Sequence, residues 1–338
     1  MKIVADIDIP YLHGVLEPYA QVVYLRGADI SPRDVADAQA LVVRTRTRCD
    51  RTLLEGSAVE AICTATAGFD HIDTGYCARH GIEVATSAGC NARAVLQWVA
   101  AVLAHLFEGR SPAGTTLGVV GAGNVGSLVA QYAAQWGLRV MCCDPPRRRR
   151  EGGNFVTLEE LAPQCDVITF HTPLNAGGED NTFHLADEQF FASLRRGTVI
   201  LNASRGEVVE SEALLKAVAT GRCACVIDTW EHEPHVNTAL VEAALLATPH
   251  IAGYTLQGKA MATVMAVRAL GRRFALPLEE WYPPDGPARV TPAEIEWNEM
   301  CRTINNYFDI EALSRHLKCN AASFEQMRNR YNYRTEYF

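Results

Sequence analysis

One glycine-rich segment constrains the fold of this chain more than any other feature: Gly121-Ala122-Gly123-Asn124-Val125-Gly126. Residues 116–120 before it are mostly apolar and β-branched, which predicts a buried strand, and residues 124–136 after it predict a helix. A G-x-G-x-x-G pattern is informative when it lies between a strand and a helix. This context predicts a doubly wound parallel α/β unit that binds a dinucleotide.

Each residue of the segment has a physical role in such a turn. Gly121 permits the tight turn, Gly123 lets the backbone approach a pyrophosphate, and Gly126 lets the helix pack closely on the strand. The amides of Asn124 and Val125 then face the phosphate at the positive end of the helix dipole. The segment therefore predicts an anion site made largely of backbone.

Asp144 ends the next predicted strand, residues 138–143. A carboxylate at that point accepts hydrogen bonds from the adenosine ribose and repels a 2′-phosphate, which favours NAD. The four arginines at 147–150 leave NADP open, because basic residues just beyond this strand can hold the extra phosphate. Such a run is more often a solvated loop. We therefore expect NAD.

The same alternation of strands and helices runs through most of the chain. Further strands are predicted at residues 2–5, 21–25, 40–43, 59–63, 82–85, 166–170, 198–201, 224–227 and 247–249. Long helices are predicted at 91–108, where the breakers 109–112 follow, and at 256–274. The expected fold is α/β, with two doubly wound, Rossmann-like parallel sheets and a short C-terminal segment.

The composition of the chain limits the partners and the compartment that can be expected for it. A chain of 338 residues exceeds the usual domain size, and its net charge of −8 gives it no general attraction for nucleic acid or anionic lipid. The longest apolar segment, 94–107, is short and is interrupted by Gln97 and His105. Eleven cysteines, without zinc spacing, are expected to be buried thiols. We expect a cytoplasmic protein without a metal site.

The C-terminal segment, residues 281–338, is rich in aromatic side chains. It holds ten of the 27 aromatic residues of the chain and is too short to form a large core of its own. The aromatic residues are therefore expected to be buried against another surface. The residues leave two surfaces open, a second subunit and the rest of the same chain.

Four segments after predicted strands carry the chemistry. They are 170–174 (FHTPL), 202–206 (NASRG), 228–234 (DTWEHEP) and 248–254 (TPHIAGY). In this order, behind the glycine-rich segment, they closely resemble the D-isomer-specific 2-hydroxyacid dehydrogenase family. The resemblance implies hydride transfer between NAD and a small 2-hydroxy acid, with residues 1–92 (completed by about 256–280) binding substrate and 93–255 binding NAD.

The resemblance assigns three catalytic residues. His250 is the expected base for the hydroxyl proton, since the pKa of histidine lies nearest working pH. Glu233 is expected to orient the imidazole, and Arg205 to bind the substrate carboxylate and C2 oxygen. Taken singly, each has an ordinary structural alternative. His171 is the competing base, but its H-T-P-L context resembles a loop that faces the cofactor.

Further positions are assigned by the same resemblance. The expected cofactor contacts beyond the glycine-rich segment are Asp144, Thr172, Asp228 and Gly253. The expected substrate contacts are Thr45, Thr66 and Tyr254. Arg44, at a strand end beside Thr45, is a candidate cation for a substrate phosphate, although it could equally line an exposed loop.

Other segments narrow the resemblance to a branch of the family that acts in vitamin B6 biosynthesis. They are 64–71, 88–92, 143–147 and 250–259. This implies oxidation of 4-phospho-D-erythronate at C2 to 3-hydroxy-2-oxo-4-phosphobutanoate. The alternatives are a dehydrogenase of an unphosphorylated acid such as glycerate, and a non-catalytic NAD-sensing protein. The branch also has a C-terminal dimerisation domain, which residues 281–338 match in shortened form, so a homodimer is expected.

Overall fold

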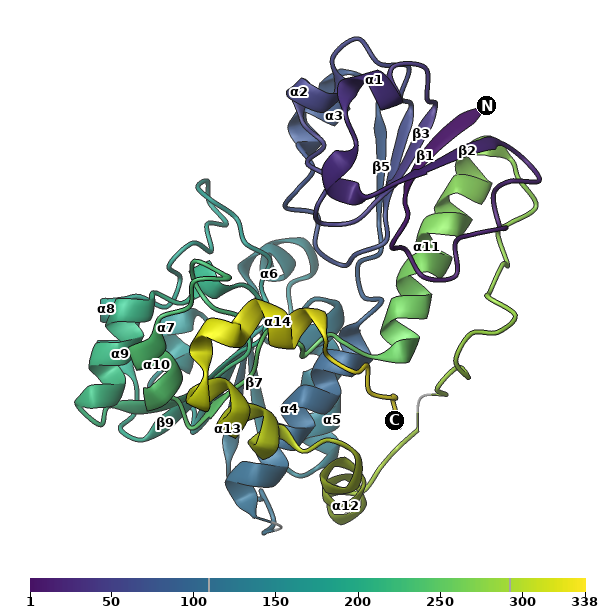
Figure 1. The fold of residues 1–338 in the computed structure, drawn as a ribbon. Helices are drawn as coiled ribbons and strands as arrows, with labels where there is room; N and C mark the ends of the chain where they lie inside the picture. Colours follow the sequence, from purple (N-terminus) through teal and green to yellow (C-terminus); the bar gives the residue numbers. More distant parts are fainter. Residues whose placement is uncertain (109, 292) are drawn as a thin grey trace. The chain divides into compact units, whose positions relative to one another are not determined.

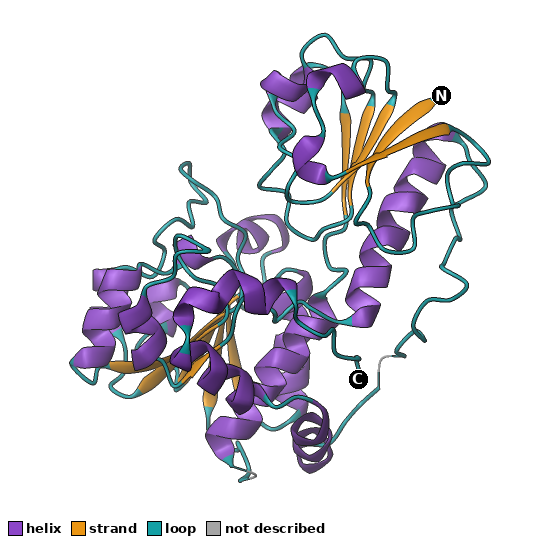
Figure 2. Cartoon of the chain, in the orientation of Figure 1, coloured by secondary structure: helices purple, strands orange, loops and turns teal. Residues whose placement is uncertain are grey.

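The computed structural model describes residues 1–108, 110–291 and 293–338. Gly109, one of the predicted helix breakers, lies outside them. The chain forms two compact units, a first unit of Met1–Asn91 with Thr255–Val290 and a second unit of Ala92–Tyr254 with Thr291–Phe338. Each unit contains a parallel sheet with helices packed around it, as Figures 1 and 2 show. The predicted α/β class with two parallel sheets is confirmed.

The first unit is built on a five-stranded sheet in the order β2-β1-β3-β4-β5. Its strands are β1 (Lys2–Asp6), β2 (Gln21–Leu25), β3 (Ala40–Val43), β4 (Ala61–Thr64) and β5 (Glu83–Thr86). One face packs on the long helix α11 (Leu256–Phe274), and the other lies near the short helices α1 (Pro32–Val35), α2 (Arg51–Leu54) and α3 (Thr74–Arg79). Because β3 is completely apolar and β4 is apolar except for Thr64, and every residue of both is buried, they are central strands covered on both faces.

The second unit is built on a six-stranded parallel sheet in the order β11-β10-β9-β8-β6-β7. Its strands are β6 (Thr116–Val120), β7 (Arg139–Cys143), β8 (Val167–Phe170), β9 (Thr198–Asn202), β10 (Cys223–Ile227) and β11 (Leu246–Ala247). Its helices before the C-terminal segment are α4 (Ala92–Phe107), α5 (Asn124–Gln135), α6 (Pro145–Glu151), α7 (Leu158–Leu161), α8 (Glu188–Ser193), α9 (Ser211–Ala219) and α10 (Thr238–Ala243). The chain reverses direction across the sheet between β6 and β8, which is where such sheets bind ligands.

Residues 291–338 of the C-terminal segment fold back on the second unit, whereas residues 281–290 belong to the first unit. Its helices are α12 (Trp297–Tyr307), α13 (Ile310–Cys319) and α14 (Phe324–Asn329), drawn in yellow tones in Figure 1. Helix α12 packs on α4 and α13 packs on β11. Trp297, Met300, Ile304 and Phe338 are buried in the same core as α4. Of the two surfaces left open by the sequence, this segment covers its own chain.

The arginine run at 147–150 is helical, so the interpretation of this run as a loop was wrong. It lies within α6, which begins at Pro145 after the N-cap Asp144. Proline at the first position and an aspartate cap both favour a helix start. Arg147 and Arg150 contact Glu151, and Arg149 pairs with Asp180.

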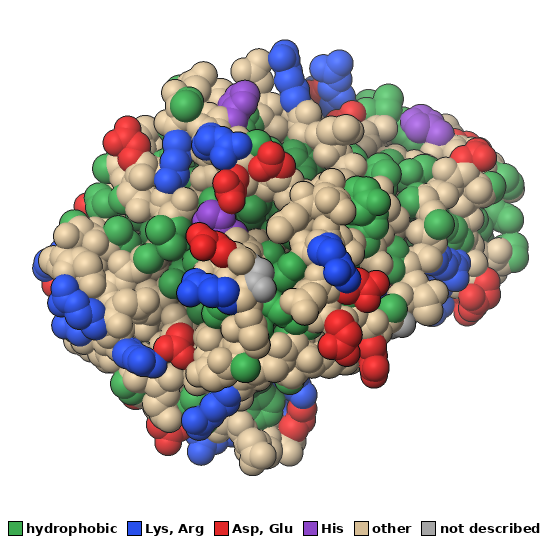
Figure 3. All heavy atoms as spheres, turned by 90° about the horizontal axis from the view of Figure 1, so that it is seen from below, with side chains coloured by type: hydrophobic (Ala, Val, Ile, Leu, Met, Phe, Trp, Pro, Cys, Tyr) green, Lys and Arg blue, Asp and Glu red, His purple; other side chains and the backbone are tan. Residues whose placement is uncertain are grey.

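Neither a membrane-spanning helix nor a cluster of potential metal ligands is found among the described residues. No helix in the described ranges is both long and apolar enough to cross a bilayer. Within those same ranges, no group of three or more histidine, cysteine, aspartate or glutamate side chains is arranged to hold a metal ion. Acidic and basic side chains are interspersed on the face drawn in Figure 3.

Candidate active site

The predicted site residues of the second unit follow the carboxyl ends of its strands. Because all six strands are parallel, these ends lie along one edge of the sheet. The glycine-rich segment follows β6, Asp144 follows β7, Thr172 follows β8, Arg205 follows β9, Asp228 and Glu233 follow β10, and His250 follows β11. The sequence therefore brings its predicted cofactor and catalytic groups of this unit to one edge.

The glycine-rich segment has the geometry that a dinucleotide requires. Gly121 has φ of +86°, and a side chain there would approach the backbone of His171. A Cβ atom at Gly126 would lie 1.9 Å from the carbonyl oxygen of Gly121, so only glycine fits between strand and helix. A Cβ atom at Gly123 would meet no atom within 4 Å, which leaves its backbone open to a ligand. Helix α5 begins at Asn124, where the first amides lack intrahelical acceptors.

Two polar groups beside this segment fit a bound dinucleotide. The carboxylate of Asp144 accepts hydrogen bonds from the amides of Ala122 (2.8 Å) and Arg147 (2.9 Å), which fixes it against the glycine-rich segment. The Thr172 hydroxyl is buried and has no hydrogen-bond partner among the described residues. A buried hydroxyl is costly unless it is paired, so a ligand atom there would satisfy it. The guanidinium of Arg147 is engaged by the Ala122 carbonyl and Glu151.

His250 and Glu233 form a hydrogen-bonded pair. Nδ1 of His250 lies 2.7 Å from Oε2 of Glu233. Burial alone raises the pKa of the Glu233 carboxyl, but His250 and Arg328 outweigh burial and hold that pKa below its ordinary value. An ionised carboxylate only accepts hydrogen bonds, so Nδ1 carries the proton and Nε2 of the neutral imidazole is left to accept one. This tautomer suits a general base.

Asp228 organises the loop that carries His250. It is 1% exposed, and burial raises the pKa of its carboxyl. Its carboxylate accepts hydrogen bonds from the Thr248 hydroxyl (2.6 Å) and from the amides of Ile251 (2.8 Å) and Ala252 (2.9 Å). His250 itself has φ of +56°, an uncommon conformation for a residue with a side chain, and its amide donates to the Asp228 carbonyl. The predicted contact of Asp228 with nicotinamide stays a prediction.

Arg205 lies in the turn between β9 and a short 3₁₀ helix. Asn202 donates from its side chain to the Arg205 carbonyl (2.9 Å), and Nη1 of Arg205 donates to the Ser204 carbonyl (2.8 Å). A Cβ atom at Gly206 would lie 2.0 Å from the backbone of Trp230, so this turn packs directly on the segment that carries Glu233. The turn therefore holds Arg205 beside the β10 loop.

His171 is poorly suited to be the base. Burial lowers the pKa of its imidazole to about 3. Its Nε2 lies 3.0 Å from the Thr169 hydroxyl, within the same strand end. A group that stays neutral down to such a pH is a weak proton acceptor near neutrality. This favours His250 over His171.

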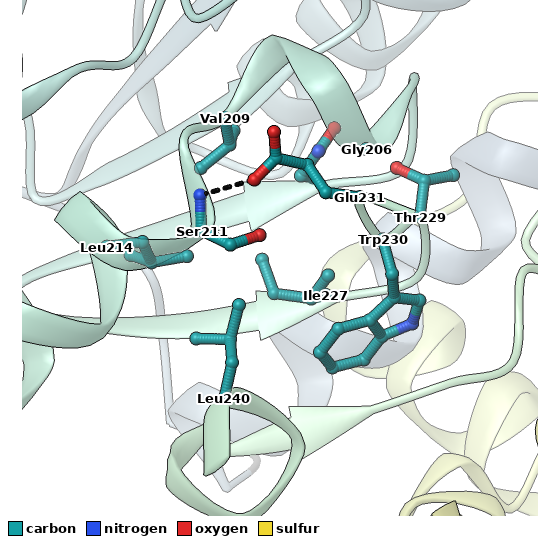
Figure 4. A pocket seen from close by; sticks show the side chains of 10 residues that line it. Gly206, Val209, Ser211, Leu214, Ile227, Thr229, Trp230, Glu231 and Leu240 are labelled. Atoms are coloured by element: carbon teal, nitrogen blue, oxygen red, sulfur yellow. Dashed lines mark hydrogen bonds between the residues drawn. The ribbon is translucent and has the colours of Figure 1, made fainter. Parts of the chain in front are cut away.

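A small cavity near the carboxyl ends of the strands of the second sheet has no room for a substrate. Its volume is about 10 Å³, which is about one water molecule. Figure 4 shows Glu231 at this cavity, where its carboxylate accepts a hydrogen bond from the Ser211 amide (2.7 Å). Its other oxygen lies 2.6 Å from Nε2 of His184. Glu231 is therefore a structural group that ties neighbouring loops together.

Arg44, in the first unit, has its charge neutralised. Its Nε lies 3.1 Å from Asp6, and its Nη2 lies 3.0 Å from Asp8. Asp6 is 1% exposed, whereas the Arg44 side chain is 27% and Asp8 62% exposed, so only the Asp6 end of this network is buried. Its predicted role at a substrate phosphate stays a prediction, with two carboxylates competing for the same guanidinium.

The two predicted substrate threonines lie after neighbouring strands of the first sheet. Thr45 is exposed in the turn after β3. Thr66 is partly buried after β4, where its hydroxyl lies 2.6 Å from the Thr64 hydroxyl and donates to the Gly68 carbonyl (2.8 Å). Both positions are at the carboxyl edge of a parallel sheet, where ligands bind in this class of fold.

The sequence analysis missed two arginines of the C-terminal segment. Arg328, in α14, donates to Glu233 (3.2 Å) and to the hydroxyl of Tyr254 (3.2 Å). Arg334 is 8% exposed and donates to backbone carbonyls of the loop that carries His250, including those of Ile251 and Ala252. The aromatic content of residues 281–338, which indicated burial, was the signal that could have directed attention to this segment. Gly253 lies in the same loop and is partly buried.

Comparison with known proteins identifies the family. The model of the D-isomer specific 2-hydroxyacid dehydrogenase NAD binding domain matches residues 91–252. A curated erythronate-4-phosphate dehydrogenase of Bacteroides fragilis is 45% identical over 341 residues, which cover 99% of this chain and 97% of that protein. The chain belongs to the D-isomer specific 2-hydroxyacid dehydrogenase family. The predictions of the family and of NAD as cofactor are confirmed.

Other relatives agree over nearly the whole chain. An erythronate-4-phosphate dehydrogenase of Porphyromonas gingivalis is 39% identical and covers 98% of this chain and 92% of its own length. Among solved structures, the TT0316 protein of Thermus thermophilus has a TM-score of 0.66 at 26% identity and covers 85% of this chain and 100% of its own. The D-lactate dehydrogenase of Aquifex aeolicus, complexed with NAD and lactic acid, has a TM-score of 0.64 at 23% identity and covers 85% and 100%. The last likeness supports the fold alone.

Proposed function

We propose that this member of the family oxidises 4-phospho-D-erythronate at C2 to 3-hydroxy-2-oxo-4-phosphobutanoate with NAD, the erythronate-4-phosphate dehydrogenase step of vitamin B6 biosynthesis. The observation that carries the proposal is the His250–Glu233 pair, 2.7 Å apart, on the edge of the sheet that also carries the glycine-rich segment. Relatives of that name match almost the full length of the chain. The pair supplies the base that alcohol oxidation needs.

The residues of the second unit divide the work of the reaction. His250 takes the C2 hydroxyl proton on Nε2, and Glu233 stabilises the imidazolium through Nδ1. Arg205 binds the carboxylate and the C2 oxygen, since a guanidinium presents two parallel donors. When bound, NAD supplies the nicotinamide ring that accepts the hydride from C2. The products are the 2-oxo acid, NADH and one proton.

A substrate series tests this function. The purified enzyme with NAD is offered 4-phospho-D-erythronate, D-erythronate and D-glycerate, and formation of NADH is followed by absorbance. We expect the phosphorylated acid to have by far the largest kcat/KM. Equal kcat/KM with and without the phosphate would favour the glycerate-type alternative. NADH binding without turnover of any acid would favour the NAD-sensing alternative.

The protein is further proposed to be a cytoplasmic homodimer that binds its substrate partly through the first unit. Support for the dimer comes from aromatic side chains exposed on the C-terminal segment. Tyr307 is 58% exposed and stacks on Tyr337, with ring centroids 4.3 Å apart. Support for a reducing compartment comes from the buried cysteines, such as Cys143 and Cys165. Sedimentation of the wild type and of Tyr307→Glu tests the dimer, which the charge is expected to weaken.

A further inference from the structure

Arg328 places a second cation beside the catalytic pair. Its guanidinium donates from Nη1 to Oε2 of Glu233 (3.2 Å) and from Nε to the hydroxyl of Tyr254 (3.2 Å). Within the described ranges, its Nη2 makes no hydrogen bond. The side chain is 30% exposed. Arg328 therefore touches two active-site residues and keeps one donor edge open.

Arg328 shares the carboxylate of Glu233 with His250, and Asp228 is a further acidic group near it. Tyr254 is a neutral partner, and Glu233 shares its Oε2 between Arg328 and His250. When His250 takes up a proton, the same carboxylate faces two cations. A guanidinium in a largely buried setting is stable when it is fully paired, so the free edge favours an anionic ligand.

The position of this edge suits the far end of the substrate. Nδ1 of His250 and Nη1 of Arg328 share one oxygen of Glu233, so the two side chains are separated by a single carboxylate atom. The phosphoryl group of the substrate lies two carbons from the carbon that reacts at His250. Nε of Arg328 also donates to the hydroxyl of Tyr254, an expected substrate contact, which places the guanidinium beside the expected substrate site. Arg205 is already engaged by the carboxylate and C2 oxygen in the proposed reaction.

We propose that Arg328 binds the phosphoryl group of the substrate and so determines selectivity for a phosphorylated acid. The proposal rests on the proposed function for the identity of that substrate. It replaces Arg44 as the principal phosphate cation, because Arg44 is paired with both Asp6 and Asp8. The planar donor edge of arginine matches the oxygens of a phosphoryl group with two hydrogen bonds, which a lysine ammonium does not do.

The test uses two variants of Arg328 and a neighbouring control. Arg328→Met removes the donor edge and Arg328→Lys keeps a charge without the fork. Arg330→Met is the matched control, since Arg330 is an exposed arginine two residues further along the chain. The kcat/KM of each protein is measured with 4-phospho-D-erythronate and with D-erythronate. Calorimetry with inorganic phosphate measures anion affinity independently of turnover.

We expect Arg328→Met to raise KM for the phosphorylated acid about 10- to 100-fold, the loss of one or two charged hydrogen bonds. The kcat/KM for D-erythronate is expected to change much less, and phosphate affinity to fall. Arg328→Lys is expected to be intermediate, and Arg330→Met to match the wild type.

An equal loss of kcat with both acids would overturn the proposal, because Arg328 would then only position Glu233. Loss of selectivity in Arg44→Met with unchanged selectivity in Arg328→Met would overturn it as well. A failure of the proposed function is seen separately, as a wild type that does not prefer the phosphorylated acid. In that event the phosphate affinities of the wild type and Arg328→Met still decide whether Arg328 is an anion site.

Discussion

His250 has an unusual backbone conformation, and both its amide and the Nδ1 atom of its ring are hydrogen-bonded. Its φ of +56° is maintained because its amide is bonded to the Asp228 carbonyl and its ring to Glu233. Strain at such a position persists only where the surroundings determine the conformation. The imidazole is thus held in one orientation by groups of the protein itself.

Replacing His250 by glutamine should slow the chemical step selectively. We expect kcat to fall by about two to four orders of magnitude, since the base is lost, while affinity for NADH stays near that of the wild type. Steady-state rates and fluorescence titration with NADH measure the two effects. His171→Gln is the control, and a larger loss in that variant would move the role of base to His171.

The ionised state of Glu233 should contribute stability that depends on pH. Its folded pKa is lowered from the ordinary value of 4.5, so the contribution is present above about that pH and is lost as the pH falls through the folded pKa. We expect the free energy of unfolding of Glu233→Gln to lie below that of the wild type near neutrality and to converge with it in acid. Urea titrations across this pH range provide the measurement. A difference that is independent of pH would show that Glu233 is not the responsible group.

Asp144 should determine the preference for NAD over NADP. Asp144→Ser removes the charge but keeps an oxygen that can cap α6. We expect kcat/KM with NAD to fall roughly tenfold and that with NADP to rise, because a 2′-phosphate is no longer repelled. The ratio of the two values is the readout. An unchanged ratio would direct attention to the arginines of α6.

At the scale of elements, two glycines in the turn from β6 to α5 are needed for different reasons, one for packing and one for access of a ligand. A methyl group at Gly126 collides with the Gly121 carbonyl, whereas one at Gly123 meets no protein atom. Gly126→Ala is expected to lower the free energy of unfolding by about 1–3 kcal/mol or more. Gly123→Ala is expected to keep Tm and weaken NAD binding. Thermal unfolding and NADH titration of both variants separate the roles, and equal loss of Tm in both would contradict them.

Elements with a strong local pattern were predictable from the sequence. The strand expected at 116–120 is β6 (Thr116–Val120), and the helix expected at 256–274 is α11 (Leu256–Phe274). Helix α6 was missed because its arginines were interpreted as a charged run, although Asp144 and Pro145 are a helix start signal. The role of the glycine-rich segment was equally predictable, since it depends on residues that are neighbours in the sequence.

Contacts between distant parts of the chain were not predictable. Arg328 and Glu233 are 95 residues apart, and no spacing rule connects them. The aromatic content of the C-terminal segment indicated burial, but did not indicate that its arginines would contact the predicted catalytic residues. The contacts of the site between residues distant in the sequence are therefore seen only in the folded structure.

At the scale of the whole molecule, Arg334 joins the C-terminal segment to the middle of the chain. Its guanidinium donates to the carbonyls of Ala94, Ile251, Ala252 and Tyr254. It also lies over the ring of Phe308, with its central carbon 4.4 Å from the ring centroid. These carbonyls belong to the start of α4 and to the loop after β11, so one side chain ties three distant segments together.

Loss of this cross-connection should be costly. Arg334→Gln is expected to lower the free energy of unfolding by roughly 2–4 kcal/mol, because several buried carbonyls lose their donor. Chemical denaturation measures the change, and Arg330→Gln, on the exposed neighbour, is expected to change it little. A wild-type stability for Arg334→Gln would mean that other donors replace the guanidinium.

Arg334 also has a consequence for the order of events during protein synthesis. The ribosome produces His250, the proposed base, well before it produces the arginine that anchors the adjoining carbonyls. A nascent chain that has emerged only as far as residue 254 holds every predicted catalytic side chain and lacks the guanidinium that anchors the carbonyls of the loop after β11. The enzyme is therefore expected to become competent late, after translation has passed position 334, and not domain by domain as it emerges.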